Sequence, residues 1–367
     1  MTSRQGNWLL LACAAVLAAI AVVAAAGAAS PPNRPLPRAK RDRPDDLHGS
    51  QIHLVYVLPS DGTDRHLDTG GEIANSVAAF QRWLAAQTGG RDLRLDTYRG
   101  RLDISFFRLK ETDAQVRSHD PYIRDLIEHE LKQAGVTRPH KLYGVWYDGS
   151  ATSACGGGAW PPELPGIVGA LYLHGQPPGA PGCDTNPFAP QGGQPGYIDF
   201  AIVHELMHTM GFVPTCAPHE TRRGHVSDSP SDLLYAGDQP WQPSVLDFGH
   251  DDYYEAHIPG CLDFAQSPFL VKAVGRVQIA RPAFVTRAGV LRLRVACLDS
   301  GSDCHTRLTV WHGGKRVGHG PIDLIAGANG TFTARLSRAA RSLLARHHRL
   351  AVVVRGPGAP PTRFTLH

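Results

Sequence analysis

The sequence predicts an α/β domain over residues 48–270, followed by a small all-β domain of sandwich type over residues 271–367. Apolar runs with strand-like and helix-like spacing alternate through the first region. Beyond residue 270, short alternating runs are separated by glycine-rich turns instead. A length of 367 residues, 42% hydrophobic and 19% charged, is typical of a globular chain that can hold two domains. This composition excludes disordered and collagen-like proteins.

Two further segments precede these domains. In residues 1–30, Arg4 is followed by an unbroken apolar run and small residues, the pattern of a signal peptide. The run is also long enough to remain as a membrane anchor, but we favour cleavage because basic residues follow it directly. Residues 31–47 are proline-rich and basic, which predicts a flexible linker. We therefore expect a secreted, extracellular protein that contacts a membrane only if the N-terminal segment is uncleaved.

The elements of the α/β domain follow from its periodicity. Alternation predicts a strand over 52–58, and apolar spacing predicts a helix over 73–87 that ends before two glycines. The remaining predictions are strands over 93–98, 102–109, 142–147 and 167–173, and a helix over 121–134. This order is typical of a sheet covered by helices.

The C-terminal region contains four predicted strands, over 290–295, 307–311, 331–336 and 350–354. Cys297 and Cys304 flank a polar turn between two of them, and this spacing predicts a disulfide. Removal of Cys13 with a signal peptide would leave six cysteines, an even number that is compatible with three disulfides in an oxidising compartment.

The formal net charge of +4 is an average over two unlike regions. Residues 48–270 hold 15 basic and 27 acidic residues, whereas residues 271–367 hold 16 basic and 3 acidic ones. The two domains could dock and neutralise each other. Alternatively, the C-terminal domain could hold the protein on an anionic surface such as a cell-envelope polymer. The modest overall charge argues against nucleic acid as a partner.

The sequence from Tyr197 to Gly211 contains the chemistry-bearing motif His-Glu-Leu-Met-His. On a helix, His204 and His208 lie one turn apart on the same face and can bind one metal ion. Glu205 is the neighbour of the first ligand, where its carboxylate can take a proton from a water on the metal. Two histidines, a carboxylate base and an open position indicate Zn²⁺ and attack of water on a peptide bond.

This motif, with Gly211 three residues after His208, resembles the metzincin clan of zinc peptidases. The resemblance implies a twisted mixed sheet above the active-site helix, with residues 167–173 as the edge strand. Such an edge could bind an extended peptide by strand addition. Cys155 and Cys183 flank that strand, and we expect them to form a disulfide.

The third metal ligand departs from the clan pattern, because Pro214 stands where a histidine is expected. The candidates that follow are His219 as first choice, then His225, then Asp228. A disulfide between Cys216 and Cys261 would hold this enlarged loop against the zinc.

The clan also has a methionine beneath the metal, and its nearest counterpart here is Leu234, a residue of similar packing volume. Tyr235, the next residue, is either a neighbour of the metal ligands or merely structural. Asp247, Asp251 and Asp252 could bind calcium, although aspartates that form turns are the commoner explanation.

The sequence thus predicts a secreted zinc endopeptidase that acts on peptide or protein substrates, with Glu205 as general base and His204, His208 and His219 as ligands. The alternative is a catalytically degenerate binding protein of the cell envelope, which Pro214 and Leu234 favour. No Gly-x-Ser-x-Gly motif supports a serine hydrolase.

Overall fold

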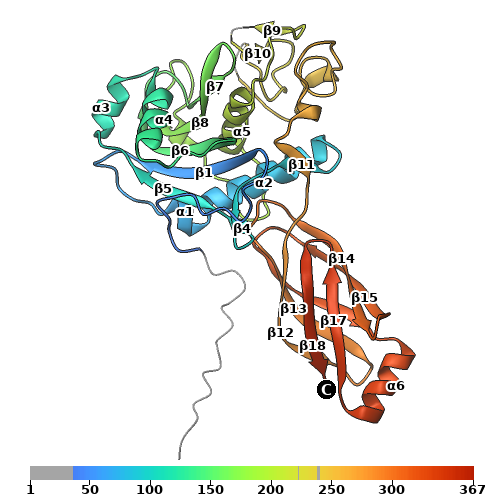
Figure 1. Cartoon of the computed structure of the whole chain (residues 1–367). Coiled ribbons are helices and arrows are strands. Elements are labelled where there is room, and N and C mark those ends of the chain that lie inside the picture. The colour runs from blue at the N-terminus through green and yellow to red at the C-terminus, as the bar shows by residue number, and fades with distance from the viewer. Residues whose placement is uncertain (1–35, 222, 238–239) are drawn as a thin grey trace, which may run out of the picture.

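The structure is a computed structural model that describes residues 36–221, 223–237 and 240–367. The predicted signal segment lies outside these residues. Within them, no helix is both long enough and apolar enough to cross a membrane. Figure 1 shows an α/β body, which holds the described chain as far as β11, and a β-rich body that holds the C-terminal residues and extends away from it.

A five-stranded mixed sheet forms the centre of the α/β body. Its order is β5 (Ile104–Arg108), β1 (Gln51–Leu58), β6 (Lys141–Ala151), β8 (Leu164–Gly175) and β7 (Gly156–Trp160). The first four strands are parallel, and β7 runs antiparallel to β8. All residues of β1 are buried, as expected for a central parallel strand covered on both faces. The predicted α/β class is confirmed.

Helices cover both faces of this sheet (Figure 1). On one face, α2 (Glu72–Gln87) and α5 (Tyr197–Thr209) pack with the short α1 (Leu67–Gly70) in one hydrophobic cluster. On the other face, α3 (Asp113–Ser118) and α4 (Ile123–Gln133) form a second cluster. The His-Glu-Leu-Met-His motif on α5 is therefore fixed between the sheet and a large apolar core.

The predicted edge strand is wrong, because β8 lies inside the sheet and β7 forms the edge. β7 begins with three glycines, which have low strand propensity and therefore hid it in the sequence. Glycine is needed there because α5 packs directly against the strand. A Cβ at Gly156 would lie 2.6 Å from Glu205 Oε1, and one at Gly158 would lie 2.7 Å from the Glu205 carbonyl oxygen.

The described part of the predicted linker, residues 36–47, is held against the α/β body. Arg38 forms ion pairs with Asp64 and Asp68. The Asp42 carboxylate lies 2.7 Å from Lys141 Nζ, and the two side chains are almost fully buried. The flexible tether expected from composition is wrong for this part, because its charged residues find buried partners of opposite sign.

The C-terminal body has its own hydrophobic cluster between two antiparallel sheets. One sheet holds β12 (Val277–Val285), β13 (Val290–Cys297) and β16 (Asn329–Arg335). The other holds β15 (Lys315–Leu324), β14 (Cys304–His312), β17 (Leu350–Gly356) and β18 (Ala359–Leu366). The β sandwich is thus present, but the all-β expectation is corrected by one helix, α6 (Arg338–His347).

Three two-stranded pairs complete the strands of the described residues. They are β3 (Thr97–Tyr98) with β4 (Arg101–Leu102), β9 (Glu220–Thr221) with β10 (His225–Val226), and β2 (Arg91–Leu93) with β11 (Leu270–Lys272). The last pair ties the end of the α/β body back to its start before the chain enters the C-terminal body.

All three predicted disulfides are confirmed: Cys155 with Cys183, Cys216 with Cys261, and Cys297 with Cys304. Such bonds are typical of proteins in an oxidising, extracellular environment.

Candidate metal centre

Helix α5 positions the first two histidines. The helix begins where the Asp199 carboxylate accepts a hydrogen bond of 2.8 Å from the Gly196 N–H. After its end, Gly211 adopts a left-handed φ of 95° and donates its N–H to the His208 carbonyl at 2.8 Å. This sharp turn, which the resemblance to the metzincin clan implies at Gly211, directs the following chain back beneath His208.

Three histidine Nε2 atoms converge beside this helix. The Nε2 of His208 lies 3.0 Å from that of His204 and 3.1 Å from that of His225. The Nε2 atoms of His204 and His225 are 3.3 Å apart. Nitrogens bound tetrahedrally to zinc at about 2.0–2.1 Å would be roughly 3.3 Å apart. The spacing of the three rings therefore fits one zinc ion.

The backbone fixes the tautomers of two of these rings. His204 Nδ1 lies 2.7 Å from the Leu233 carbonyl, and His208 Nδ1 lies 2.7 Å from the Phe212 carbonyl. A carbonyl oxygen only accepts, so each Nδ1 carries the hydrogen and each Nε2 of the neutral ring is a bare lone pair. Two lone pairs 3.0 Å apart repel each other unless a cation lies between them. The donor set thus fits a metal ion.

Burial keeps His204 and His208 neutral, as metal ligands must be. It lowers the pKa of His204 to about 3, and the neighbouring His225 acts in the same direction. Burial also lowers the pKa of His208 well below its ordinary value. Glu205 responds in the opposite sense, because burial of its carboxyl group raises its pKa to about 8, which the positive charge of Arg124 opposes.

The third histidine is His225, the second choice from the sequence, and not His219. His225 lies on β10, and the following residue pairs with the loop beyond. The Val226 N–H donates to the Leu234 carbonyl at 3.0 Å, and the Ala236 N–H donates to the Val226 carbonyl at 3.1 Å. These bonds hold His225 over α5.

His219 lies in a different group, with Asp228, Asp251 and Asp252. Its N–H donates to Asp252 Oδ1 at 2.8 Å, and its Nδ1 lies 3.1 Å from Asp252 Oδ2. The prediction of His219 as a ligand of the histidine site is corrected, because Asp252 holds this ring away from α5. Asp228, the third choice, is exposed and also belongs to this second group.

Asp247 does not share the group of Asp251 and Asp252. Its Oδ2 accepts N–H hydrogen bonds from Tyr253 at 2.8 Å and Tyr254 at 2.7 Å. Asp247 is therefore explained by the backbone N–H groups that its carboxylate binds, in agreement with the expectation that these aspartates form turns.

The turn from Ser231 to Tyr235 supports the histidine site from below. Leu234 is fully buried in the core that contains α5. The buried Asp232 holds the turn, because its Oδ1 accepts the Leu234 N–H at 2.6 Å and its Oδ2 accepts the Phe248 N–H at 2.7 Å. Burial raises the pKa of Asp232 to about 7. The sequence reasoning assigned Asp232 no role; its position two residues before a buried N–H, as in an Asx turn, was the available signal.

A cleft of about 750 Å³ opens over the histidines. Glu205 and the glycines of β7 form one side, and Tyr197, Tyr235 and Trp241 form an aromatic part of the lining. Trp241 is locked in place, because its Nε1 donates to the Asp232 carbonyl at 3.0 Å and its ring meets that of His204 edge-on. Tyr235 thus borders the cleft, whereas Trp241 was not foreseen from the sequence.

No family model and no curated protein matches the chain. Among solved structures, wild-type OgpA from Akkermansia muciniphila matches with 14% identity and a TM-score of 0.34, over 90% of this chain and 95% of that one. A catalytically inactive OgpA from the same organism, in complex with the O-glycopeptide glycodrosocin, matches with 13% identity and a TM-score of 0.32, over 90% of this chain and 94% of that one. Scores this low do not establish a shared fold, so function is inferred below from the site itself.

Proposed function

We propose that the protein is a zinc-dependent endopeptidase of metzincin type, with His204, His208 and His225 as zinc ligands and Glu205 as the proton carrier. The single observation that carries this proposal is the convergence of three Nε2 atoms within 3.3 Å, beside a carboxylate in an open cleft. A structural metal site needs neither the carboxylate nor the opening.

Zinc, when bound, would supply a Lewis acid that makes water acidic enough to lose a proton near neutral pH. Glu205 adjoins the first ligand along α5 and lines the cleft, and beside a bound cation its pKa would lie below the raised value of the metal-free site, so that its carboxylate can accept that proton. It can then return the proton to the nitrogen of the departing amine. The Leu233 and Phe212 carbonyls hold the His204 and His208 rings in the orientation that keeps Nε2 available.

Strand β7 offers a means to bind the substrate chain. Among the described residues it is the last strand of the sheet, with one edge paired to β8. An extended peptide can add to such an edge through backbone hydrogen bonds. Because Gly156, Gly157 and Gly158 carry no side chains, none of them obstructs a peptide that lies in the cleft next to Glu205. A cleft of this kind admits the middle of a chain, which supports an endopeptidase.

The test is the substitution Glu205→Gln. It preserves the histidines and the shape of the side chain but removes the base, so zinc content should stay at one per chain. Hydrolysis of an unfolded protein substrate should fall by about a hundredfold to ten-thousandfold. Glu163→Gln is the matched control, because it makes the same charge change on an exposed turn and should leave activity unchanged. Wild-type protein without stoichiometric zinc, or a Glu205→Gln variant that cleaves as fast as wild type, would contradict the proposal.

The alternative of a degenerate binding protein rests on Pro214 and Leu234. It predicts a metal without an open coordination position. A hydroxamate chelator separates the two functions, because it raises the melting temperature of the zinc-loaded protein only where such a position exists. We expect a clear increase, and no increase would favour the degenerate protein.

A further inference from the structure

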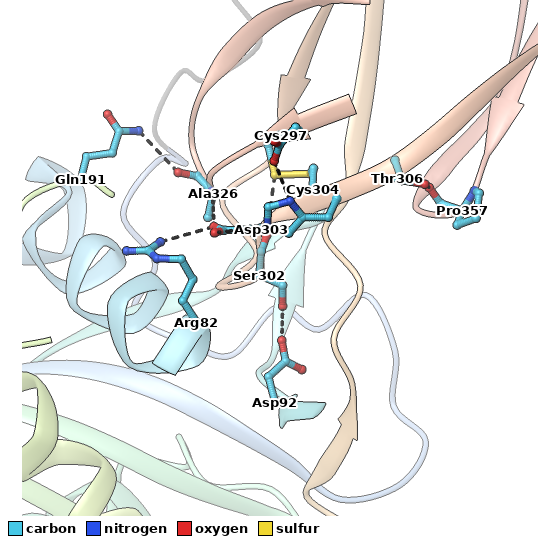
Figure 2. Close-up of a disulfide and its surroundings, with 12 residues drawn as sticks. Arg82, Asp92, Gln191, Cys297, Ser302, Asp303, Cys304, Thr306, Ala326 and Pro357 are labelled. Atoms are coloured by element: carbon cyan, nitrogen blue, oxygen red, sulfur yellow. Dashed lines mark hydrogen bonds and ion pairs between the residues drawn. A yellow bond between two sulfur atoms is a disulfide. The ribbon is translucent and has the colours of Figure 1, made fainter. Parts of the chain in front are cut away.

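From composition, basic residues of the C-terminal body are expected to meet acidic residues of the α/β body. At the contact that Figure 2 shows, an acidic residue of the C-terminal body meets an arginine of the α/β body instead. Arg82 of the acidic body lies 3.3 Å from Asp303 of the basic one. The positive charge of Arg101, also in the acidic body, acts on Asp299 of the basic body. Ser302 donates a hydrogen bond to Asp92. The Cys297 to Cys304 disulfide staples the loop that carries these residues.

Most of the acidic residues of the basic body therefore lie at this contact. Asp299 and Asp303 are two of the three acidic residues in 271–367, whereas Arg276, 3.7 Å from Asp45, is the basic residue that reaches across. Within the described residues, no arginine from Arg281 onwards forms an ion pair with a carboxylate. The two domains therefore do dock, but apart from the pair of Arg276 with Asp45 their contact does not neutralise the arginines of the C-terminal domain. The positive charge of the C-terminal body remains available to a partner.

Part of this charge lies on the outward face of the four-stranded sheet, opposite to its buried core residues. Thr309 on β14 pairs with His319 on β15 and with Arg355 on β17. In the next row, Val353 on β17 pairs with Trp311 on β14 and with Arg363 on β18. The strands thereby place exposed arginines beside a tryptophan on one surface.

The tryptophan and the arginines around it are held in place. The Arg355 guanidinium carbon lies 4.4 Å from the centre of the Trp311 ring, and Trp311 Nε1 donates to Thr309 Oγ1 at 2.8 Å. A hollow of about 850 Å³ adjoins this ring. Arg281 from β12 and Arg363 from β18 line the hollow, and Arg281 donates to the Arg363 carbonyl at 3.2 Å. The hollow is large enough for a ligand of a few sugar rings.

We propose that this surface, defined by Arg281, Trp311, Arg355 and Arg363 and called the Trp311 face, binds an anionic polysaccharide. Guanidinium groups pair with carboxylate and sulfate through two parallel hydrogen bonds, and the planar fork needs little ordering on binding. The three arginines lie on three different strands, and such spaced positive charges suit a polymer whose negative charges repeat. The Trp311 face is separate from the peptidase cleft and would hold the enzyme on a glycan while the cleft acts on protein.

The same face is poorly suited to other polyanions. Nucleic-acid bases need an open aromatic face on which to stack, whereas Arg355 already covers Trp311. A lipid surface needs large apolar side chains that insert, and the exposed residues that line the hollow are basic, polar or small: Arg281, Pro282, Gly313, Ala351, Arg363, Thr365 and His367. The disulfides indicate an oxidising compartment, where glycans are the common polyanions.

The test uses the full-length protein and heparin as the probe, with uncharged dextran as the blank. We expect heparin binding that weakens with salt, and a dissociation constant that rises at least about tenfold in an Arg355→Gln/Arg363→Gln variant. Arg292→Gln/Arg294→Gln is the matched control, because it removes two exposed charges from the outward face of β13 in the other sheet. The control should change the constant less than about threefold.

Three results would overturn the proposal. They are failure of the wild type to bind heparin at about 0.15 M salt, equal weakening by the two double variants, and tighter binding to DNA or to anionic lipid vesicles than to heparin. Circular dichroism and the melting temperature check that both variants fold, since all four arginines are exposed.

Discussion

Two histidine clusters lie within the same stretch of chain and differ in what the second ring nitrogen meets. In the cluster over α5, Nδ1 of His204 and of His208 donates to a backbone carbonyl, and the rings stay neutral. In the other cluster, Nδ1 of His219 meets the Asp252 carboxylate, which raises the pKa of His219. Burial reinforces the contrast, because the His219 side chain is 40% exposed. A backbone carbonyl at Nδ1 leaves the Nε2 lone pair of a neutral imidazole free to bind a metal ion. A carboxylate at Nδ1 of an exposed imidazole instead favours the protonated, positively charged ring.

The largest expected difference between the clusters is in zinc affinity. His225→Ala removes one of three ligands and should raise the zinc dissociation constant at least about a hundredfold, since zinc sites release on the order of 10 kcal/mol shared among their ligands. His219→Ala, the matched control, should leave the constant within about threefold. Competition with a fluorescent chelator measures both. Loss of affinity in the His219 variant alone would reverse the assignment.

The turn that orients His204 in the α5 cluster can be disturbed without substituting any of the three histidines. Asp232→Asn puts an amide N–H where Asp232 accepts hydrogen bonds from Leu234 and Phe248, and so disturbs the turn whose Leu233 carbonyl orients His204. Loss of such an outer partner should weaken zinc binding about tenfold to hundredfold. Asp228→Asn makes the same change at an exposed site and should have no effect. Unchanged zinc affinity in the Asp232 variant would show that the turn is not needed to orient the ring.

The smallest expected effect is the pH dependence of the second cluster. Because the pKa of His219 is raised in the folded protein, its pair with Asp252 contributes stability that is fully present below about pH 6.5, the unfolded pKa. This contribution is lost as the pH rises through the raised pKa. Exposure limits it to less than about 1 kcal/mol. Urea unfolding of metal-free wild type and His219→Gln should differ more at pH 5.5 than at pH 8.5, and a larger difference at high pH would contradict the pairing.

Local patterns predicted the parts of the molecule that depend on local sequence. Helix α5 and the three disulfides follow from spacing within short segments or from cysteine positions, and the resemblance to the metzincin clan implies the sharp turn at Gly211. The choice of His219 failed because chain order does not reveal which loop residue folds back. His225 is fixed by hydrogen bonds to a turn beyond it, and Asp252, far along the chain, captures His219.

The predictions for strand β7 and for the segment 36–47 failed for a different reason. Glycines give no strand signal, and their presence is explained only by close neighbours in the fold, Glu205 for Gly156 and Gly158 and the Tyr172 hydroxyl for Gly157. The basic, proline-rich segment has the composition of a solvated linker, and its buried partners, such as Lys141 for Asp42, come from distant strands. Composition left open whether the two domains dock through their opposite charges, and the ion pair of Arg82 with Asp303 has the opposite sense to the one that composition suggests.

The most direct test of the zinc site is X-ray absorption spectroscopy at the zinc edge on the loaded protein. We predict three imidazole nitrogens at about 2.0 Å in wild type and in His219→Ala, and only two in His225→Ala. A first shell with a carboxylate in place of one imidazole, or one that loses an imidazole in the His219 variant, would contradict the assignment of His204, His208 and His225 as the ligands.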